Sequence, residues 1–378
     1  QSEPDKKEYA PADVVLFLDA LDQLNPTDNA HMLYWIPREL AHGVKVVMSV
    51  LETERKKERK GNSDQYDLVK RIWPDSLVEL GPLDDAAGAD LLDAWLKEAH
   101  RDLQPDQRDE VLDKFGRNGR PFFLKLAFEE ARRWKSWEGL PGGSTGMPGL
   151  QDTIEGILDD LFRRLEQEQH HGKTLVSRAL GYIGAGKNGL TEDELLDVLS
   201  RDEDVMKDFF RRSPDSPPID RLPVVVWSRL FSDIQRYMTQ RRADGAIIMD
   251  FYHRQVGEAV ARRYLPDVKR LKAHQHLADY FHDLDYWAES IEEQRARAKR
   301  LPPTPRPANI RKVVELPHHR LEAAKLGGNN DPKSPLWDAV ADLLTDWQFL
   351  EAKAEADPFG KYAAEHEKAA GANKEGEL

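Results

Sequence analysis

The sequence predicts an α/β fold followed by a mostly α-helical region. We expect a partial doubly wound parallel sheet, then a helical domain, a winged helix and a helical connector. Three observations predict this order: apolar runs alternate with helical patterns in the first 80 residues, a hairpin pattern follows several helices near the middle, and helical periodicity dominates the rest. The expected domains cover residues 1–82, 83–150, 151–268 and 269–378.

Composition limits the class of protein. A chain of 378 residues with 40% hydrophobic and 33% charged residues fits several globular domains, and no apolar run reaches the length of a membrane span. The sequence has no cysteine, which excludes disulfides and cysteine-ligated metal and favours a cytoplasmic location. A formal charge of −13 makes nucleic acid an unlikely main partner, because phosphate binding needs clustered Lys and Arg.

The first apolar run carries the main chemical signal. Residues 14–18 (VVLFL) predict a strand buried on both faces, and the run ends at Asp19, with Asp22 and Gln23 just beyond. A carboxylate at this end of a parallel strand lies where α/β sheets bind ligands, and in phosphate-loop NTPases an Asp there holds Mg²⁺. The alternative is a buried strand that leads into a helix capped by Asp.

The following segments extend the predicted sheet. We expect a helix over residues 31–40, a second strand over 44–50, a helix over 66–73 and a third strand over 77–80. Ser49 lies near the end of the second strand, from which its hydroxyl can reach a γ-phosphate bound at the first.

Helices dominate the next region, with patterns over residues 84–100, 109–115 and 122–134. The run Gly119-Arg120-Pro121 precedes the last of these. Proline is well tolerated at the first position of a helix, because its missing N–H would be unpaired there, so this run can be simply a helix boundary.

A winged helix is predicted next. Helical patterns are followed by two β-prone runs, over 236–241 and 246–252, and Asp244-Gly245 suits the hairpin turn between them. The helices are expected over residues 153–167, 173–182, 191–199 and 225–234. The last of these carries one basic residue, Arg229, whereas a helix that reads DNA normally presents several polar and cationic side chains.

One run inside this region imitates a phosphate-binding loop. Residues 181–188 (GYIGAGKN) fit G-x4-G-K, with Asn188 where Ser or Thr should follow. The preceding residues look helical rather than extended, and Thr191 with Glu194 forms a capping box. We therefore predict a turn between two helices.

The last region is predicted to be a helical connector. A helix from about residue 271 is followed by a basic, Pro-rich loop over 295–311 and by helices over 313–325 and 336–356. Eleven of the twelve histidines, all except His253, give no metal pattern, because adjacent pairs such as His170 with His171 and His318 with His319 are not expected to face one ion from a helix.

Several of these motifs together resemble a known family. The run LFLDALDQL at 16–24, the W-x-P at 35–37 and VKVVMSVL at 44–51 resemble the second half of the nucleotide-binding domain of NACHT-type STAND NTPases. Glu315 to His318 resembles the connector that precedes the β-propeller or tetratricopeptide repeats of such proteins. Since no Gly-rich loop precedes residue 14, we expect an N-terminally truncated fragment that lacks the Walker A loop.

The resemblance implies a signalling switch that ADP locks and ATP opens, with oligomerisation after opening and with ATP/ADP and Mg²⁺ as cofactors. It also implies five roles: Mg²⁺ binding as the Walker B residue for Asp19, positioning of the attacking water for Asp22, γ-phosphate sensing for Ser49, adenine packing for Pro121 and contact with the ADP β-phosphate for His253. The alternative for His253 is a histidine that caps a helix.

Other implications concern activity and partners. Gln23 stands where many members carry an acidic residue, so we expect slow hydrolysis in a longer parent protein and an inactive fragment. The implied partners are nucleotide, other copies of the chain and proteins bound by downstream repeats. Two other functions remain open: a non-catalytic protein-interaction scaffold, and a DNA-associated regulatory ATPase that grips duplex through the winged helix.

Overall fold

A computed structural model of the chain describes residues 14–21, 24, 27–51, 65–135, 149–287, 307–328, 331 and 333–356. The chain divides into two compact units, Gln1–Gly81 and Pro82–Leu378, so the first expected domain boundary falls close to this division. Within the described ranges, no helix combines the length and the apolar character that crossing a membrane requires.

The first unit contains a pair of parallel strands, β1 (Val14–Leu18) and β2 (Val44–Met48), aligned so that Val14 lies opposite Val44. The 3₁₀ helix η2 (Thr27–Met32) lies in the connection between the strands, and α1 (Gln65–Ile72) and η3 (Pro74–Ser76) follow. Its small core consists of Leu21, Leu33, Ile36, Leu68 and Val69. The predicted parallel pairing of the first two strands is confirmed, but the described residues do not form the larger doubly wound sheet.

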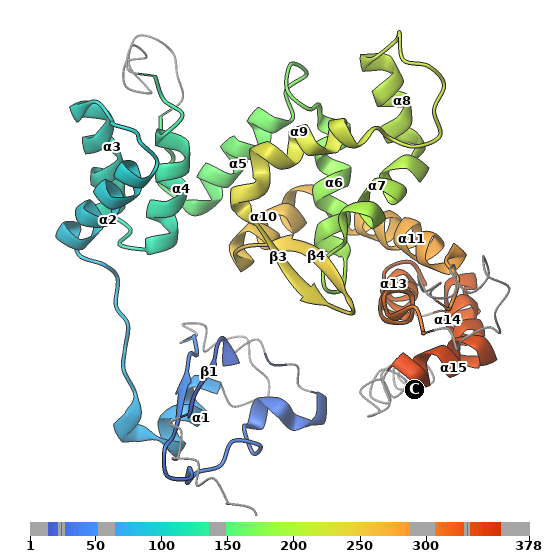
Figure 1. Cartoon of the computed structure of the whole chain (residues 1–378), viewed down its shortest axis with the longest axis horizontal. Coiled ribbons are helices and arrows are strands. Elements are labelled where there is room, and N and C mark those ends of the chain that lie inside the picture. Colours follow the sequence, from blue (N-terminus) through green and yellow to red (C-terminus); the bar gives the residue numbers. More distant parts are fainter. Residues whose placement is uncertain are drawn as a thin grey trace, which may run out of the picture. The chain divides into compact units, whose positions relative to one another are not determined.

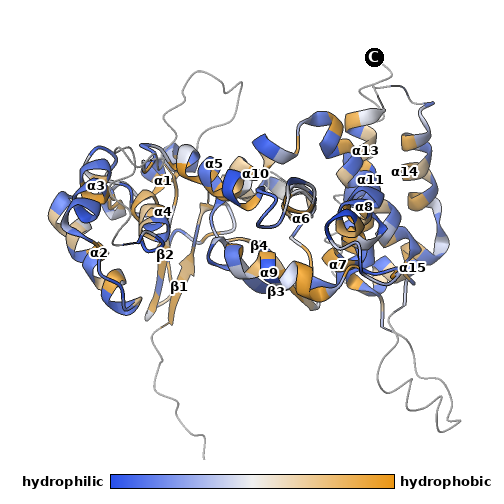
Figure 2. Ribbon diagram, turned by 90° about the horizontal axis from the view of Figure 1, so that it is seen from above, coloured by the Kyte–Doolittle hydropathy of each residue, from blue (hydrophilic) through white to orange (hydrophobic). Residues whose placement is uncertain are grey.

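Three predictions for this unit are wrong. Residues 77–80 form no strand, and residues 33–40 turn irregularly after η2 instead of forming a helix, with Leu33 in the left-handed region at φ +57°. The strand β1 is not buried, and Phe17 is 72% exposed. The apolar composition of both strands is visible in Figure 2. In the described residues β1 pairs with β2 alone, and a pair of strands does not cover its own faces.

The second unit begins with three packed helices, α2 (Asp85–Glu98), α3 (Pro105–Gly116) and α4 (Pro121–Ala131). All three were predicted, and α3 begins four residues earlier than expected because Pro105 provides its first turn. The side chain of Phe115 is fully buried in their core.

The winged helix follows, with the hairpin of β3 (Met238–Ala243) and β4 (Ala246–Phe251) after a set of helices (Figure 1). Asp244 and Gly245 form its turn with φ of +51° and +76°, as a type I′ hairpin requires. The helices are α5 (Ile154–Leu165), α6 (Lys173–Ala185), α7 (Glu192–Arg201), α8 (Glu203–Arg212) and α9 (Val224–Ile234). The predicted helices are confirmed, whereas α8 was missed.

The run that imitates a phosphate-binding loop is confirmed as a turn between helices. Helix α6 continues to Ala185, so the first two glycines of the run lie inside it. Thr191 and Glu194 form the predicted capping box at the start of α7. A phosphate-binding loop follows a strand, so this run is not one.

The connector is helical, as predicted. Helix α10 (Arg254–Tyr264) still belongs to the winged helix, and the connector region continues with α11 (Asp267–Asp283), α13 (Ile310–Gly327), α14 (Pro335–Thr345) and α15 (Trp347–Ala356). The single helix predicted over 336–356 is in fact two, because the backbone of Asp346 is extended and its carboxylate accepts a hydrogen bond from Gln348 N. Most of the predicted Pro-rich loop lies outside the described residues.

A buried network of charges joins the connector to the winged helix. The Arg311 side chain on α13 is 8% exposed and donates hydrogen bonds to Glu194 at 2.8 and 2.9 Å, Asp244 at 3.1 Å, Glu315 at 3.0 Å and Gly189 O at 2.9 Å. Glu194 belongs to α7 and Asp244 to the hairpin turn. A buried guanidinium is tolerated only when its donors are paired in this way, so the network fixes α13 on the winged helix.

Stability should depend on pH through Glu315. Burial alone would raise the pKa of this carboxyl, but the nearby His319 and Arg311 and the Lys187 N–H lower it from 4.5 to about 2. A carboxylate whose pKa is lower in the folded state stabilises the fold above pH 4.5, and this contribution is lost as pH falls toward 2. Urea unfolding measures the free energy of unfolding of wild type and of Glu315→Gln. We expect the wild-type advantage in this free energy to be about 3 kcal/mol smaller at pH 2 than at pH 5. An unchanged difference would contradict the prediction.

Candidate functional site

In the first unit, the structure brings Asp19 and Ser49 together. Ser49 Oγ donates a hydrogen bond to Asp19 Oδ1 and accepts one from Ala20 N at 2.7 Å. The backbone supports this contact, because Ser49 N donates to Leu18 O at 3.0 Å and Leu21 N to Ser49 O at 2.9 Å. Both side chains are exposed at the carboxyl ends of the parallel strands, where ligands bind in α/β sheets.

The oxygens of this pair fit a magnesium ion chemically. Mg²⁺ prefers oxygen ligands, keeps several waters and binds through one or two carboxylates together with substrate phosphates. Asp19 supplies an exposed carboxylate, and Ser49 supplies a hydroxyl beside it. Asp22, the predicted water-positioning residue, lies outside the described residues, as does Gln23.

In the second unit, Pro121 begins α4 and is exposed. Gly119 precedes it with φ of +64°, and a Cβ on Gly119 would lie 2.7 Å from Pro82 Cβ. The backbone there is also held by a hydrogen bond from Leu83 N to Gly119 O at 2.8 Å. The helix boundary is therefore real, and the glycine is required by its conformation and its close packing. The adenine role of Pro121 stays a prediction.

His253 caps α10 and also faces α4. Its Nδ1 accepts a hydrogen bond from Gln255 N at 3.2 Å, so the capping alternative is correct in structure. Its ring stacks on Phe122, with centroids 3.7 Å apart and planes inclined by 13°. Burial, and then the charge of Arg254, lowers the pKa of the His253 ring.

This geometry determines which ring nitrogen of His253 can act as a donor. Because Nδ1 accepts a backbone hydrogen bond, the neutral ring carries its proton on Nε2. In the part of the chain that the structure describes, nothing is hydrogen-bonded to this Nε2. A half-buried N–H donor that needs no positive charge is therefore available to an anionic ligand.

Phe122 is the site residue that sequence reasoning missed. It brings the start of α4, where Pro121 lies, against the start of α10. The only available signal was its place directly after Pro121, and no local pattern links it to a residue 131 positions later.

Ion pairs hold the two domains around this contact. Arg164 on α5 makes a bidentate pair with Glu130 on α4, at 2.5 and 2.8 Å. Arg236, before the wing, lies 3.3 Å from the buried carboxylate of Glu129. Helix α4 is thus fixed on the winged helix, which keeps the Phe122–His253 stack in place.

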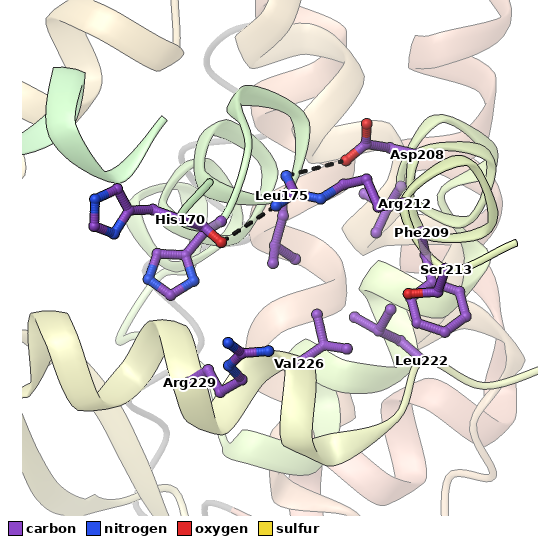
Figure 3. A pocket seen from close by; sticks show the side chains of 11 residues that line it. His170, Leu175, Asp208, Phe209, Arg212, Ser213, Leu222, Val226 and Arg229 are labelled. Carbon is purple, nitrogen blue, oxygen red and sulfur yellow. Dashed lines mark hydrogen bonds and ion pairs between the residues drawn. The ribbon is translucent and has the colours of Figure 1, made fainter. Parts of the chain in front are cut away.

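A separate cavity of about 180 Å³ lies in the winged helix, between α6, α8 and α9 (Figure 3). Its lining includes His170, Arg229 and Arg212. The Arg212 guanidinium already donates to the carbonyl oxygens of Glu168 at 2.8 Å and His170 at 3.2 Å. None of the four predicted site residues that the structure describes lines this cavity.

Comparison with known families identifies the class of the central domain. Residues 147–272 match the model of the NWD1-like winged helix-turn-helix domain. The predicted winged helix is therefore confirmed.

Relatives extend this result to most of the chain. It is 33% identical over 330 residues to the NACHT domain- and WD repeat-containing protein 1 of Homo sapiens, which covers 83% of this chain and 20% of that protein. It is 31% identical over 281 residues to the NACHT and WD repeat domain-containing protein 2 of Mus musculus, covering 73% of this chain and 15% of the relative. A TPR repeat-containing protein of Dictyostelium discoideum is 24% identical over 335 residues, covering 88% of this chain and 16% of the relative. No solved structure matches the chain.

These matches confirm the resemblance to NACHT-type STAND proteins. The chain spans a fifth or less of the length of these relatives, whose names include WD or TPR repeats.

Proposed function

We propose that the chain belongs to a nucleotide-dependent signalling switch, which ADP locks closed and ATP opens for oligomerisation and downstream signalling. The observation that carries the proposal is the Phe122–His253 stack, because it joins the two segments of the second unit that the family resemblance assigns to nucleotide. The similarity to NACHT-containing relatives supports the same reading.

In the closed state, His253 holds the diphosphate. Its Nε2–H donates to a β-phosphate oxygen, while the Gln255 N–H fixes the ring through Nδ1. Pro121 offers an exposed apolar ring for adenine at the start of α4, one residue before the stack. Displacing the winged helix from α4 removes the histidine from the phosphate, so ADP binding and domain closure reinforce each other.

Asp19 and Ser49 serve the triphosphate. Bound Mg²⁺ would neutralise phosphate charge, and Asp19 would hold it through water. The Ser49 hydroxyl, which donates a hydrogen bond to Asp19 in this structure, would instead donate to a γ-phosphate oxygen. This contact would distinguish ATP from ADP. Asp22 would position the attacking water, and hydrolysis would be slow, as suits a switch.

We further propose that the switch acts in the cytoplasm through other copies of itself and through protein partners. The WD and TPR repeats in the names of the relatives support partners bound by repeats. A pure scaffold would share those partners and lack nucleotide binding, so nucleotide binding decides between the two functions.

The test is calorimetric titration of ADP and ATP with Mg²⁺ into a protein that carries this chain together with a phosphate-binding loop. We expect His253→Asn to weaken ADP binding about tenfold, which corresponds to one hydrogen bond to a charged group. ATP binding should change much less, because His253 contacts nucleotide only in the closed state. Asparagine caps helices well, so this variant keeps the start of α10 stable while it removes the imidazole that donates to phosphate and stacks on Phe122.

His170→Asn is the matched control, because His170 is exposed in the same domain, lies between α5 and α6, and takes no part in the Phe122–His253 stack. It should leave ADP affinity unchanged. Absence of nucleotide binding in the unmodified protein would favour the scaffold, and equal ADP affinity in His253→Asn would remove His253 from the site.

A further inference from the structure

Three histidines from two helices of the connector converge on one point. They are His274 on α11 and the adjacent His318 and His319 on α13, and one ring nitrogen from each lies within 4.8 Å of the others. Their ring centroids are 5.1 to 5.6 Å apart. The expectation that adjacent histidines cannot face one ion is therefore wrong. Adjacent residues of α13 can lie on either side of the line along which this helix contacts α11. His274 on α11 then lies close to both His318 and His319.

The neighbours of His319 determine which of its ring nitrogens faces the other two histidines. Its Nε2 lies 3.1 Å from Glu315 Oε2, and its Nδ1 lies 2.9 Å from His274 Nδ1. The Glu315 carboxylate is itself held by Arg311 at 3.0 Å and by Lys187 N at 2.9 Å. A carboxylate on one ring nitrogen retains the proton there and leaves the other nitrogen free to bind a metal, which is the usual outer support of a metal-bound histidine.

The other two rings are also suited to binding. His274 is 4% exposed, and the ring of His318 meets it edge-on, with centroids 5.6 Å apart. His318 is half-buried, which leaves a route for an ion, and no described residue is hydrogen-bonded to it. The hydrogen bond between His274 and His319 accounts for the position of those two rings. It does not account for the position of His318 beside them.

We propose that His274, His318 and His319 bind a transition-metal ion, with Zn²⁺ as the chemically preferred one. Imidazole nitrogens suit Zn²⁺, and three of them leave the fourth tetrahedral position to water. On binding, the Nδ1 proton of His274 moves through solvent to Nε2 of the same ring, so that the neutral rings of His274 and His319 each present an Nδ1 lone pair to the ion. The ion would link α11 to α13 and so strengthen the connector.

The alternative is a metal-free relay in which His274 Nδ1–H donates to His319 Nδ1 and His319 donates to Glu315. The relay leaves His318 unused, whereas the metal site needs it. Substitution of His318 therefore separates the two interpretations without disturbing the hydrogen bonds of the other rings.

The experiment uses the full chain after treatment with a chelator. Zn²⁺ is titrated by calorimetry, and Co²⁺ is titrated with visible absorbance as a report of nitrogen coordination. We expect one Zn²⁺ per chain, a higher melting temperature with Zn²⁺, and at least tenfold weaker binding by His318→Gln. His170→Gln, which changes an exposed histidine outside the cluster, should bind as wild type does.

Two results would overturn the proposal. One is the absence of Zn²⁺ binding by the folded wild-type chain. The other is equal affinity in wild type and His318→Gln, which would place any bound ion elsewhere. The melting temperature of His318→Gln without metal shows whether that variant is folded. His274→Gln provides a second test, and it should also lose the melting shift caused by Zn²⁺.

Discussion

Replacing Arg311 with Met should lower the free energy of unfolding of the second unit by about 3 to 5 kcal/mol. The guanidinium is buried and neutralises Glu194, Glu315 and Asp244. Methionine fills similar space but leaves these carboxylates without their main counter-charge, and an unpaired buried charge is far more costly than a lost surface pair. Urea unfolding followed by circular dichroism measures the change.

Arg201→Met is the control for this prediction. Arg201 pairs with Asp283 at 2.8 Å, but both side chains are about half exposed. Such surface pairs contribute about 1 kcal/mol or less. Equal losses in the two variants would mean that the buried network does not fix the connector. The double variant Arg311→Met, Glu315→Gln should lose less than the sum of the two single losses, because the two residues interact directly.

Trp227→Ala should destabilise the winged helix by about 3 to 5 kcal/mol. Trp227 lies in the middle of α9, is 1% exposed and is among the largest fully buried side chains of the described residues. Its removal opens a cavity that the surrounding helices cannot fill, which adds to the lost burial of apolar surface. Thermal and urea unfolding of the purified chain measure the loss.

The matched control is Trp347→Ala, since Trp347 begins α15 and is 74% exposed. It should change stability by about 0.5 kcal/mol or less, as most exposed positions do. A small effect of Trp227→Ala would mean that α9 does not pack into the core, and it would reopen the possibility that this helix presents its side chains to DNA.

The winged helix could be predicted because its signals are local. The Asp244-Gly245 pair specifies the hairpin turn, and Thr191 with Glu194 marks a helix start within four residues. Helix α8 was missed because a single residue separates it from α7: Asp202 is both the C-cap of α7 and the N-cap of α8. Two helices with one residue between them give a pattern without the usual break.

The contacts that define the candidate site could not be predicted in the same way. Phe122 and His253, or Arg311 and Glu194, meet through the packing of whole helices, and no periodicity encodes such pairs. Asp19 and Ser49 were expected at the same sheet edge because parallel strands align their carboxyl ends. The apolar side chains of β1 indicated a strand that is usually buried, but the pattern could not specify which other element packs against it.

The Arg311 anchor has a mechanical consequence. Because Arg311 holds α13 on both α7 and the wing turn, we expect any movement of the winged helix to carry the first part of the connector with it. A small turn at the Phe122–His253 contact would then be amplified along the connector, with a displacement that grows in proportion to the distance from the pivot. In the proposed switch, such a displacement would reach α14 and α15 through α13, on which both helices pack.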